Sequence, residues 1–183
     1  MYSKKDLRQL IRQRNKQLSE QLKRQQSVAI LTQLAQHPLF LSAQTILLFH
    51  SLPDEVCTHT FIQQWSLKKQ ILLPVVKGND LELRPYTNSA AMQNGAYGIN
   101  EPTGTAFTKL ESIDLIIVPG MAFDAEGHRL GRGKGYYDRL LSQPPLRSTY
   151  KIGICLPHQL VNHVTTEAHD VLMNEVLTQS SHT

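Results

Sequence analysis

Hydrophobic residues follow two different spacings along the chain. In the amino-terminal segment, Leu7, Ile11, Leu18 and Leu22 recur four, seven and four positions apart, which places them on one face of a helix. We expect helical structure from there to about Pro38. Further along, apolar side chains occupy consecutive positions in short runs, as is typical of strands that are covered on both faces.

These runs alternate with segments of helical periodicity. Strands are predicted at 45–50, 70–76, 81–86, 114–120, 150–156 and, as a short one, 175–178, and helices at 58–69, 135–142 and 160–168. The alternation indicates a layered α/β domain with a largely parallel sheet and right-handed crossovers, and we expect one domain over residues 1–183. Residues 87–104 show little periodicity, so we expect a long irregular loop there, a kind of segment that often carries function.

Composition places the chain among ordinary globular proteins. Of its 183 residues, 40% are hydrophobic and 19% are charged, and a disordered chain would have fewer aliphatic residues and more charge. No apolar run approaches the roughly 18 residues of a membrane span, and charges at the amino terminus argue against a signal peptide. We therefore expect a cytoplasmic protein without a membrane partner, with Cys57 and Cys155 as reduced thiols.

Positive charge is concentrated at the amino terminus. The net charge is +4, and residues 1–25 hold eight Lys or Arg against two acidic residues. Such a segment is either a solvated helix surface or a contact for a polyanion, meaning nucleic acid or a nucleotide phosphate. Taken alone, the segment favours the solvated surface.

The stretch "HRLGRGKGYYDRLL" at 128–141 combines glycines with basic residues. It follows a predicted buried strand and leads into a predicted helix, at the sheet edge where open α/β folds bind ligands. Its alternate glycines and the two cations between them are Gly131, Arg132, Gly133, Lys134 and Gly135. Such glycines let backbone amides approach an anion, and Asp138, four positions after Lys134, can hold a magnesium ion that bridges phosphate oxygens. The stretch therefore predicts a phosphate site.

Standard nucleotide motifs do not match this stretch. A Walker A loop needs Ser or Thr after its lysine, but Gly135 follows Lys134, and Tyr136 stands where the dinucleotide motif needs glycine. A glycine turn with a surface Lys134–Asp138 pair, worth about 0–1 kcal/mol, is the plainer alternative. A nucleic-acid-binding module, a sugar-phosphate isomerase and an acyl-CoA-binding protein also remain open as function classes.

A longer stretch, "VPGMAFDAEGHRLGRGKGYYDRLL", resembles the signature of the 5-formyltetrahydrofolate cyclo-ligase family, also called 5,10-methenyltetrahydrofolate synthetases. "KKDLRQLIRQR", "SLPDEVCT", "GAYGINEP" and "EAHDVLMNEVLT" resemble the family's opening helix, second segment, central loop and tail. The resemblance implies a three-layer α/β/α sandwich. It also implies an enzyme that uses ATP and Mg²⁺ to convert 5-formyltetrahydrofolate to 5,10-methenyltetrahydrofolate, releasing ADP and phosphate. We therefore expect a small-molecule substrate, no nucleic-acid partner and a monomeric protein.

Site residues follow from the same resemblance. ATP binding falls on Lys4, Lys5, Asp6, Leu7, Arg8, Arg129, Leu130, Gly131, Arg132, Gly133, Lys134, Gly135, Tyr136 and Tyr137, folate binding on Leu52, Cys57 and the five residues from Arg132 to Tyr136, and the metal on Asp138 and Asp170. Relatives commonly have an acid at the position of Cys57, so we expect Glu55 to substitute for it. On an extended strand, positions 55 and 57 project to the same side. Many relatives also have aspartate where this chain has Asn174.

The family's reaction resembles phosphoryl transfer. The formyl oxygen of the folate is phosphorylated, and N10 attacks the resulting iminium phosphate before phosphate leaves. No protein nucleophile is required, so we assign catalysis to charge neutralisation by Arg132 and Lys134 and to the metal. Tyr136 and Tyr97 are candidate walls for the pterin.

Overall fold

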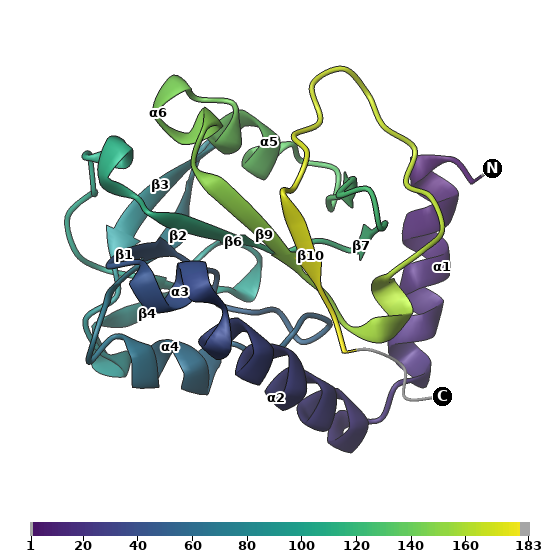
Figure 1. The fold of residues 1–183 in the computed structure, drawn as a ribbon, viewed down its shortest axis with the longest axis horizontal. Coiled ribbons are helices and arrows are strands. Elements are labelled where there is room, and N and C mark those ends of the chain that lie inside the picture. The colour runs from purple at the N-terminus through teal and green to yellow at the C-terminus, as the bar shows by residue number, and fades with distance from the viewer. Residues whose placement is uncertain (1, 180–183) are drawn as a thin grey trace.

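The central element is a mixed sheet. The structure, a computed structural model, describes residues 2–179, and within them six strands are ordered β10-β9-β6-β1-β2-β3 (Figure 1). Their bounds are Thr45–Leu47 for β1, Gln70–Lys77 for β2, Asp80–Pro85 for β3, Leu115–Val118 for β6, Tyr150–Ile154 for β9 and Glu175–Leu177 for β10. Only the β2–β3 pair among these is antiparallel. All six predicted strands and the largely parallel sheet are confirmed.

Helices cover both faces of this sheet. Those that do so are α2 (Glu20–Gln36), α3 (Pro38–Ser42), α4 (His59–Trp65), α5 (Tyr136–Leu141) and α6 (Pro144–Arg147), and α1 (Lys4–Gln17) lies apart from them. Helices α2, α3 and α4 lie on one face, and α5 and α6 lie on the other (Figure 1). Neighbouring strand residues separate accordingly, because Ile46 packs with the first group and Leu47 with the second. The consecutive apolar positions therefore have the cause that we expected, and the predicted α/β/α sandwich is confirmed.

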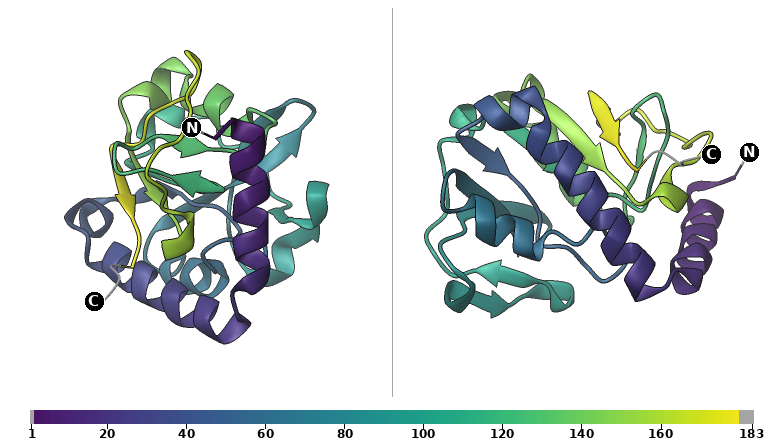
Figure 2. Two further views of the ribbon diagram at one scale, coloured as in Figure 1. Left: turned by 90° about the vertical axis from the view of Figure 1, so that its right-hand side faces the viewer. Right: turned by 60° about the horizontal axis from the view of Figure 1, so that its bottom comes forward.

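Helix α1 lies outside both helical layers (Figure 2). Its buried residues Leu7 and Ile11 pack against a small hairpin formed by β7 (Ala122–Phe123) and β8 (Arg129–Leu130). This hairpin leads directly into the glycine-rich stretch. The packing of α1 therefore places the amino-terminal cations beside the predicted phosphate loop.

One predicted helical face is interrupted. Helix α1 ends at Gln17, and the hydroxyl of Ser19 accepts the amide of Leu22 as the cap of a new helix. The direction of the chain changes at this point, so Leu22 does not continue the buried face and is 44% exposed. A third helix begins at Pro38, where we expected the helices to end.

Two other expectations were wrong. Residues 160–168 form no helix, because the amides of Val161 and Val164 donate to Phe123 O and Asp124 Oδ2 instead of to carbonyls within a helix. Residues 87–104 are not an irregular loop, since they contain the strands β4 (Met92–Asn94) and β5 (Asn100–Pro102) as a hairpin. The short 3₁₀ turns of the described chain are Ser89–Ala91, Ala96–Gly98, Leu110–Ser112 and Pro157–Gln159. Among residues 2–179, no helix has both the length and the apolar character of a membrane span.

Candidate active site

A cavity of about 840 Å³ opens at the carboxyl ends of neighbouring parallel strands. Residues that follow β1 and β6, such as Leu52 and Gly120, line it together with Val76 of β2. This is the edge at which open α/β sheets bind ligands. The volume lies within the range of small-molecule and cofactor sites.

The glycine-rich loop forms one side of this cavity. Gly133 and Gly135 have φ values of 101° and 69°, a region that favours glycine over other residues. Arg8 of α1 donates through Nε to the carbonyl of Gly131 at 2.8 Å and so fixes the loop against the helix. Lys134 is exposed at the cavity, and no ion pair within residues 2–179 involves Lys134 or Arg8. The loop and helix α1 therefore each present one cation, Lys134 and Arg8, that is available to an anionic ligand.

Arg129 and Asp138 form a buried ion pair beside this loop. Their closest atoms, Nη2 and Oδ2, are 2.9 Å apart, and the arginine side chain is only 4% exposed. The other carboxylate oxygen of Asp138 accepts the amide of Val171 at 3.2 Å. Within residues 2–179, the buried Nε of Arg129 has no hydrogen-bond partner. Burial raises the pKa of the adjacent Tyr137 phenol, and the negative charge of Glu55 adds to this shift.

Lys4 forms ion pairs with Asp170, the second residue predicted to bind the metal, and with Glu167. Its ammonium lies 2.6 Å from Glu167 Oε2 and 2.6 Å from Asp170 Oδ2. Burial opposes ionisation of Asp170, but hydrogen bonds from Lys4 and from the Glu167 amide outweigh it, so the pKa of this carboxyl lies below its ordinary value. Asp138, Glu167 and Asp170 all line the cavity, and carboxylate oxygens are the ligands that magnesium prefers. Asp170 offers a ligand atom within 4.8 Å of those of Glu167 and His169, but among the described residues Asp138 does not belong to this group.

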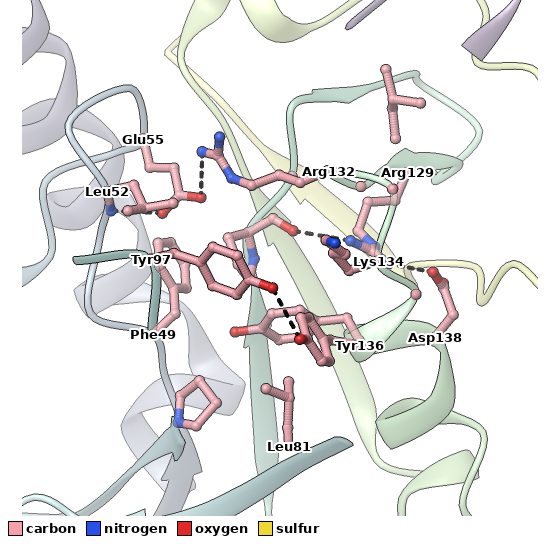
Figure 3. A pocket seen from close by; sticks show the side chains of 18 of the residues that line it. Phe49, Leu52, Glu55, Leu81, Tyr97, Arg129, Arg132, Lys134, Tyr136 and Asp138 are labelled. Carbon is pink, nitrogen blue, oxygen red and sulfur yellow. Dashed lines mark hydrogen bonds and ion pairs between the residues drawn. The ribbon is translucent and has the colours of Figure 1, made fainter. Parts of the chain in front are cut away.

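The opposite side of the cavity carries acids that Arg132 contacts. As Figure 3 shows, Arg132 extends from the loop toward Glu55. The guanidinium donates to both oxygens of Asp54, at 3.2 and 2.5 Å, and to Glu55 Oε1 at 2.9 Å. Glu55 Oε2 accepts the amide of Leu52 at 2.9 Å. Burial raises the pKa of Glu55 although the charge of Arg132 opposes that change.

Two tyrosines meet at the cavity (Figure 3). The hydroxyls of Tyr97 and Tyr136 are 3.2 Å apart, and their ring centroids are 6.4 Å apart with an angle of 61°. Tyr97 has φ 58° and ψ 21°, a left-handed conformation that is strained for a side chain of this size. Such strain is concentrated at functional sites.

Most of the predicted site residues lie together. Lys4, Arg8, Leu52, Glu55, the whole of 129–138 and Asp170 line the cavity. Lys5 and Asp6 are exposed on α1 without lining it, and Leu7 packs under the β7–β8 hairpin.

The environments of Cys57 and Glu55 differ. Cys57 is exposed and is not among the cavity-lining residues, and its amide donates to Ser27 Oγ at 3.0 Å. Residues 51–58 form a turn and irregular structure in place of a strand. The expectation that positions 55 and 57 project to the same side therefore rested on the wrong local structure.

Several cavity residues were missed by sequence reasoning. Asp54 and Glu167 bind loop or amino-terminal cations, and their only sequence signal is proximity to Glu55 and Asp170. His50 lines the cavity and stacks on His59 with ring centroids 3.8 Å apart. Burial, with a smaller effect of His59, lowers the pKa of His50 to about 4, so this ring is neutral at neutral pH. Glu101, from the supposed loop 87–104, is the other missed acid.

Comparison with known proteins gives a consistent result. Residues 1–179 match the 5-formyltetrahydrofolate cyclo-ligase family. A 5-formyltetrahydrofolate cyclo-ligase of Escherichia coli strain K12 is 32% identical, with 93% of this chain and 97% of that protein covered. The corresponding mouse protein is 29% identical over 98% of this chain and 95% of its own. The structure of 5,10-methenyltetrahydrofolate synthetase from Aquifex aeolicus is similar with a TM-score of 0.85 and 33% identity, covering 96% of this chain and 89% of that one.

Proposed function

The chain belongs to the 5-formyltetrahydrofolate cyclo-ligase family, and from this membership we propose that it converts 5-formyltetrahydrofolate to 5,10-methenyltetrahydrofolate. The reaction uses one ATP with Mg²⁺ and releases ADP and phosphate. The proposal covers residues 1–183 as a single domain that acts as a cytoplasmic monomer.

One observation carries this proposal. A single cavity combines the glycine-rich loop and the adjacent Arg8 of α1 with an aromatic and acidic wall. Within residues 2–179, neither Arg8 nor Lys134 of the loop has an ion-pair partner. The first side suits phosphates and the second suits a flat ring with N–H donors. A nucleic-acid-binding module would present its cations on an open face, and a sugar-phosphate isomerase would not need the second side.

ATP is proposed to bind along the glycine-rich loop. Backbone amides near Gly133, together with Arg8 and Lys134, would contact the phosphates. Asp138 and Asp170 would hold the magnesium ion, which supplies charge neutralisation on phosphate oxygens. Binding would replace the present contacts of Asp170 with Lys4, and the released ammonium could then contact a phosphate.

The chemical step needs no nucleophile from the protein. The formyl oxygen attacks the terminal phosphorus of ATP, and the bond to the ADP oxygen breaks. N10 of the folate then attacks the activated formyl carbon and loses its proton, and phosphate leaves with the electrons of the C–O bond. Lys134 and Arg132 would stabilise the negative charge on the transferring group, and binding in one cavity would keep the two reactants close together.

The folate is proposed to bind against the opposite wall. Tyr97 and Tyr136 would contact the pterin ring, and Leu52 and Glu55 would contribute from the turn after β1. Glu55 holds Arg132 with one oxygen and the amide of Leu52 with the other. It would therefore act by positioning Arg132 between the two substrates.

A direct assay tests the proposal. The absorbance of methenyltetrahydrofolate should rise after 5-formyltetrahydrofolate, ATP and Mg²⁺ are added together, and ADP should form in an equal amount. Omission of any one component should stop both signals. ADP formation that does not depend on the formylfolate, or a salt-sensitive affinity for RNA that persists in Lys134→Ala, would contradict it.

A further inference from the structure

Glu101 differs from the other acids of the cavity. It lies in β5, is only 5% exposed and lines the cavity. The other five acids there, Asp54, Glu55, Asp138, Glu167 and Asp170, each lie within ion-pair distance of Arg132, Arg129 or Lys4. Within residues 2–179, no ion pair involves Glu101. A buried carboxylate without a cation is costly for the fold, and such groups are typical of functional sites.

Only part of the Glu101 carboxylate is used by the protein. Oε1 accepts the amide of Val76 at 3.0 Å, which fixes the side chain against β2. In the part of the chain that the structure describes, no hydrogen bond to Oε2 is present, and this oxygen is not among the buried atoms that lack a partner. Oε2 therefore keeps some exposed surface and is available as an acceptor.

Gly95 makes room for this carboxylate. It precedes Tyr97 in the β4–β5 hairpin, and a Cβ atom at this position would overlap the carboxylate of Glu101. The φ of Gly95 is −106°, a value that any residue can adopt, so its backbone conformation does not require glycine. The close approach of Glu101 explains why glycine stands here.

We propose that Glu101 binds the pyrimidine edge of the pterin by accepting hydrogen bonds from its ring N–H and its exocyclic amino group. This inference rests on the proposed function and assigns the residue that recognises the ring. Val76, Tyr97 and Ile99 line the same cavity as Glu101 and offer apolar surface to a flat ring. A carboxylate that accepts from two neighbouring N–H donors gives both affinity and orientation.

Glu55 is less suited to this role. Both of its oxygens already accept hydrogen bonds within the protein, from Arg132 Nη2 and from the Leu52 amide, each at 2.9 Å. A pterin bound there would have to compete with these donors. Glu101 has a free oxygen, so it can accept the ring without losing an existing contact.

Steady-state kinetics of Glu101→Gln tests the inference. The amide can keep the contact with Val76 through its oxygen, but its NH₂ group then faces the N–H donors of the pterin. We expect the KM for 5-formyltetrahydrofolate to rise roughly 10- to 100-fold, as for the loss of a hydrogen bond to a charged group, with less than about twofold change in the KM for ATP. Glu82→Gln, the same change on β3 outside the cavity, should leave both constants unchanged.

A substrate analogue without the exocyclic amino group distinguishes direct contact from a structural role. The analogue should bind the wild-type protein more weakly than the natural folate does, and Glu101→Gln should discriminate less between the two. If Glu101→Gln keeps the wild-type folate KM, or weakens both compounds by the same factor, the inference is wrong. If Glu101→Gln does not fold, Gly95→Ala serves as the second variant, because its Cβ atom displaces the Glu101 carboxylate. We expect the same rise in the folate KM. A wild-type protein without turnover would instead contradict the proposed function.

Discussion

The two sides of the cavity are built in different ways. The glycine-rich side is one continuous segment, 129–138, which enters from β8 and ends in α5. The opposite wall comes from the turn after β1, from β2 and from the β4–β5 hairpin, and contributes Glu55, Val76 and Glu101 respectively. A continuous segment shows its chemistry in the order of its residues, whereas an assembled wall shows it only after the strands are placed side by side.

The two sides also differ in how their charges are used. Lys134 and Arg8 have no ion-pair partner in the described chain, so the loop side keeps its positive charge for a ligand. On the wall, Asp54 and Glu55 are neutralised by Arg132, which reaches across from the loop. Among residues 2–179, no hydrogen bond to Oε2 of Glu101 is present. We therefore expect substitutions on the loop side to affect the rate and those on the wall to affect folate affinity.

Replacement of the exposed loop lysine should have the largest effect. Lys134→Ala should lower kcat roughly 10²- to 10³-fold, because a preorganised donor at a developing charge contributes this much in other enzymes. The melting temperature should stay near that of the wild type, since the side chain is exposed and without an ion pair in the described chain. Lys109→Ala, an exposed lysine outside the cavity, is the control. Near-normal kcat in Lys134→Ala would remove this lysine from phosphoryl transfer.

The turn between β7 and β8 should show the next largest effect, on stability. Asp124 is 1% exposed and accepts the amides of Glu126, His128 and Val164 at 2.9 to 3.1 Å as well as His128 Nδ1. Asp124→Asn should lower the free energy of unfolding by about 2 kcal/mol, because its NH₂ group faces donors. Urea unfolding measures this loss, and Glu126→Gln, an exposed neighbour, is the control.

The pH dependence of stability offers a second measurement at Asp124. Burial disfavours its ionised form, but the hydrogen bonds outweigh this effect and hold the pKa below the ordinary value of 3.8. The ionised form is thus favoured in the folded state. Its contribution is present above pH 3.8 and is lost as pH falls through the lowered pKa of the folded state. In Asp124→Asn, the free energy of unfolding should therefore fall less steeply as pH decreases below 3.8. If its pH dependence in acid equals that of the wild type, Asp124 does not cause the loss of stability.

The metal residues should give an effect of intermediate size. Asp138→Asn and Asp170→Asn should each raise the Mg²⁺ concentration for half-maximal rate by about tenfold, or about 1.4 kcal/mol, because a hard cation loses one carboxylate. Asp138→Asn should also lower the melting temperature, since it leaves the Arg129 side chain buried without its charge partner. Glu111→Gln, an exposed change outside the cavity, is the control. Wild-type Mg²⁺ dependence in both variants would place the metal elsewhere.

The sequence predicts the structure correctly where the pattern of neighbouring residues determines the element. All six strands of the sheet were predicted, and several of them are apolar on consecutive positions, a pattern that strands buried on both faces have. The helix predicted at 160–168 failed because Asp124 and Phe123, distant in sequence, accept its amides. Contacts of this kind leave no local periodicity.

The same distinction holds for the site. Lys134 and Asp138 could be chosen from their spacing within one segment. Glu101 could not, because its environment depends on Val76 and on the space that Gly95 leaves, and the hairpin containing both Gly95 and Glu101 was taken for an irregular loop. Cys57 was assigned to the folate site by resemblance to a family position, but the local turn places it outside the cavity lining.

Substitution at Cys57 should therefore have the smallest effect, and it tests whether position 57 takes part in folate binding. The thiol is exposed, and the contact of this residue with Ser27 is made by its backbone amide. Cys57→Ser keeps that amide, so the free energy of unfolding should change by less than about 0.5 kcal/mol, as at other surface positions. The folate KM should be unchanged in Cys57→Ser and also in Cys57→Glu, which introduces the acid common in relatives.

A clearly lower folate KM in Cys57→Glu would show that residues 52–57 rearrange when folate binds and bring position 57 to the pterin. In that case the acid at position 57 and Glu101 would share the recognition of the ring, and combining Cys57→Glu with Glu101→Gln would restore part of the lost affinity.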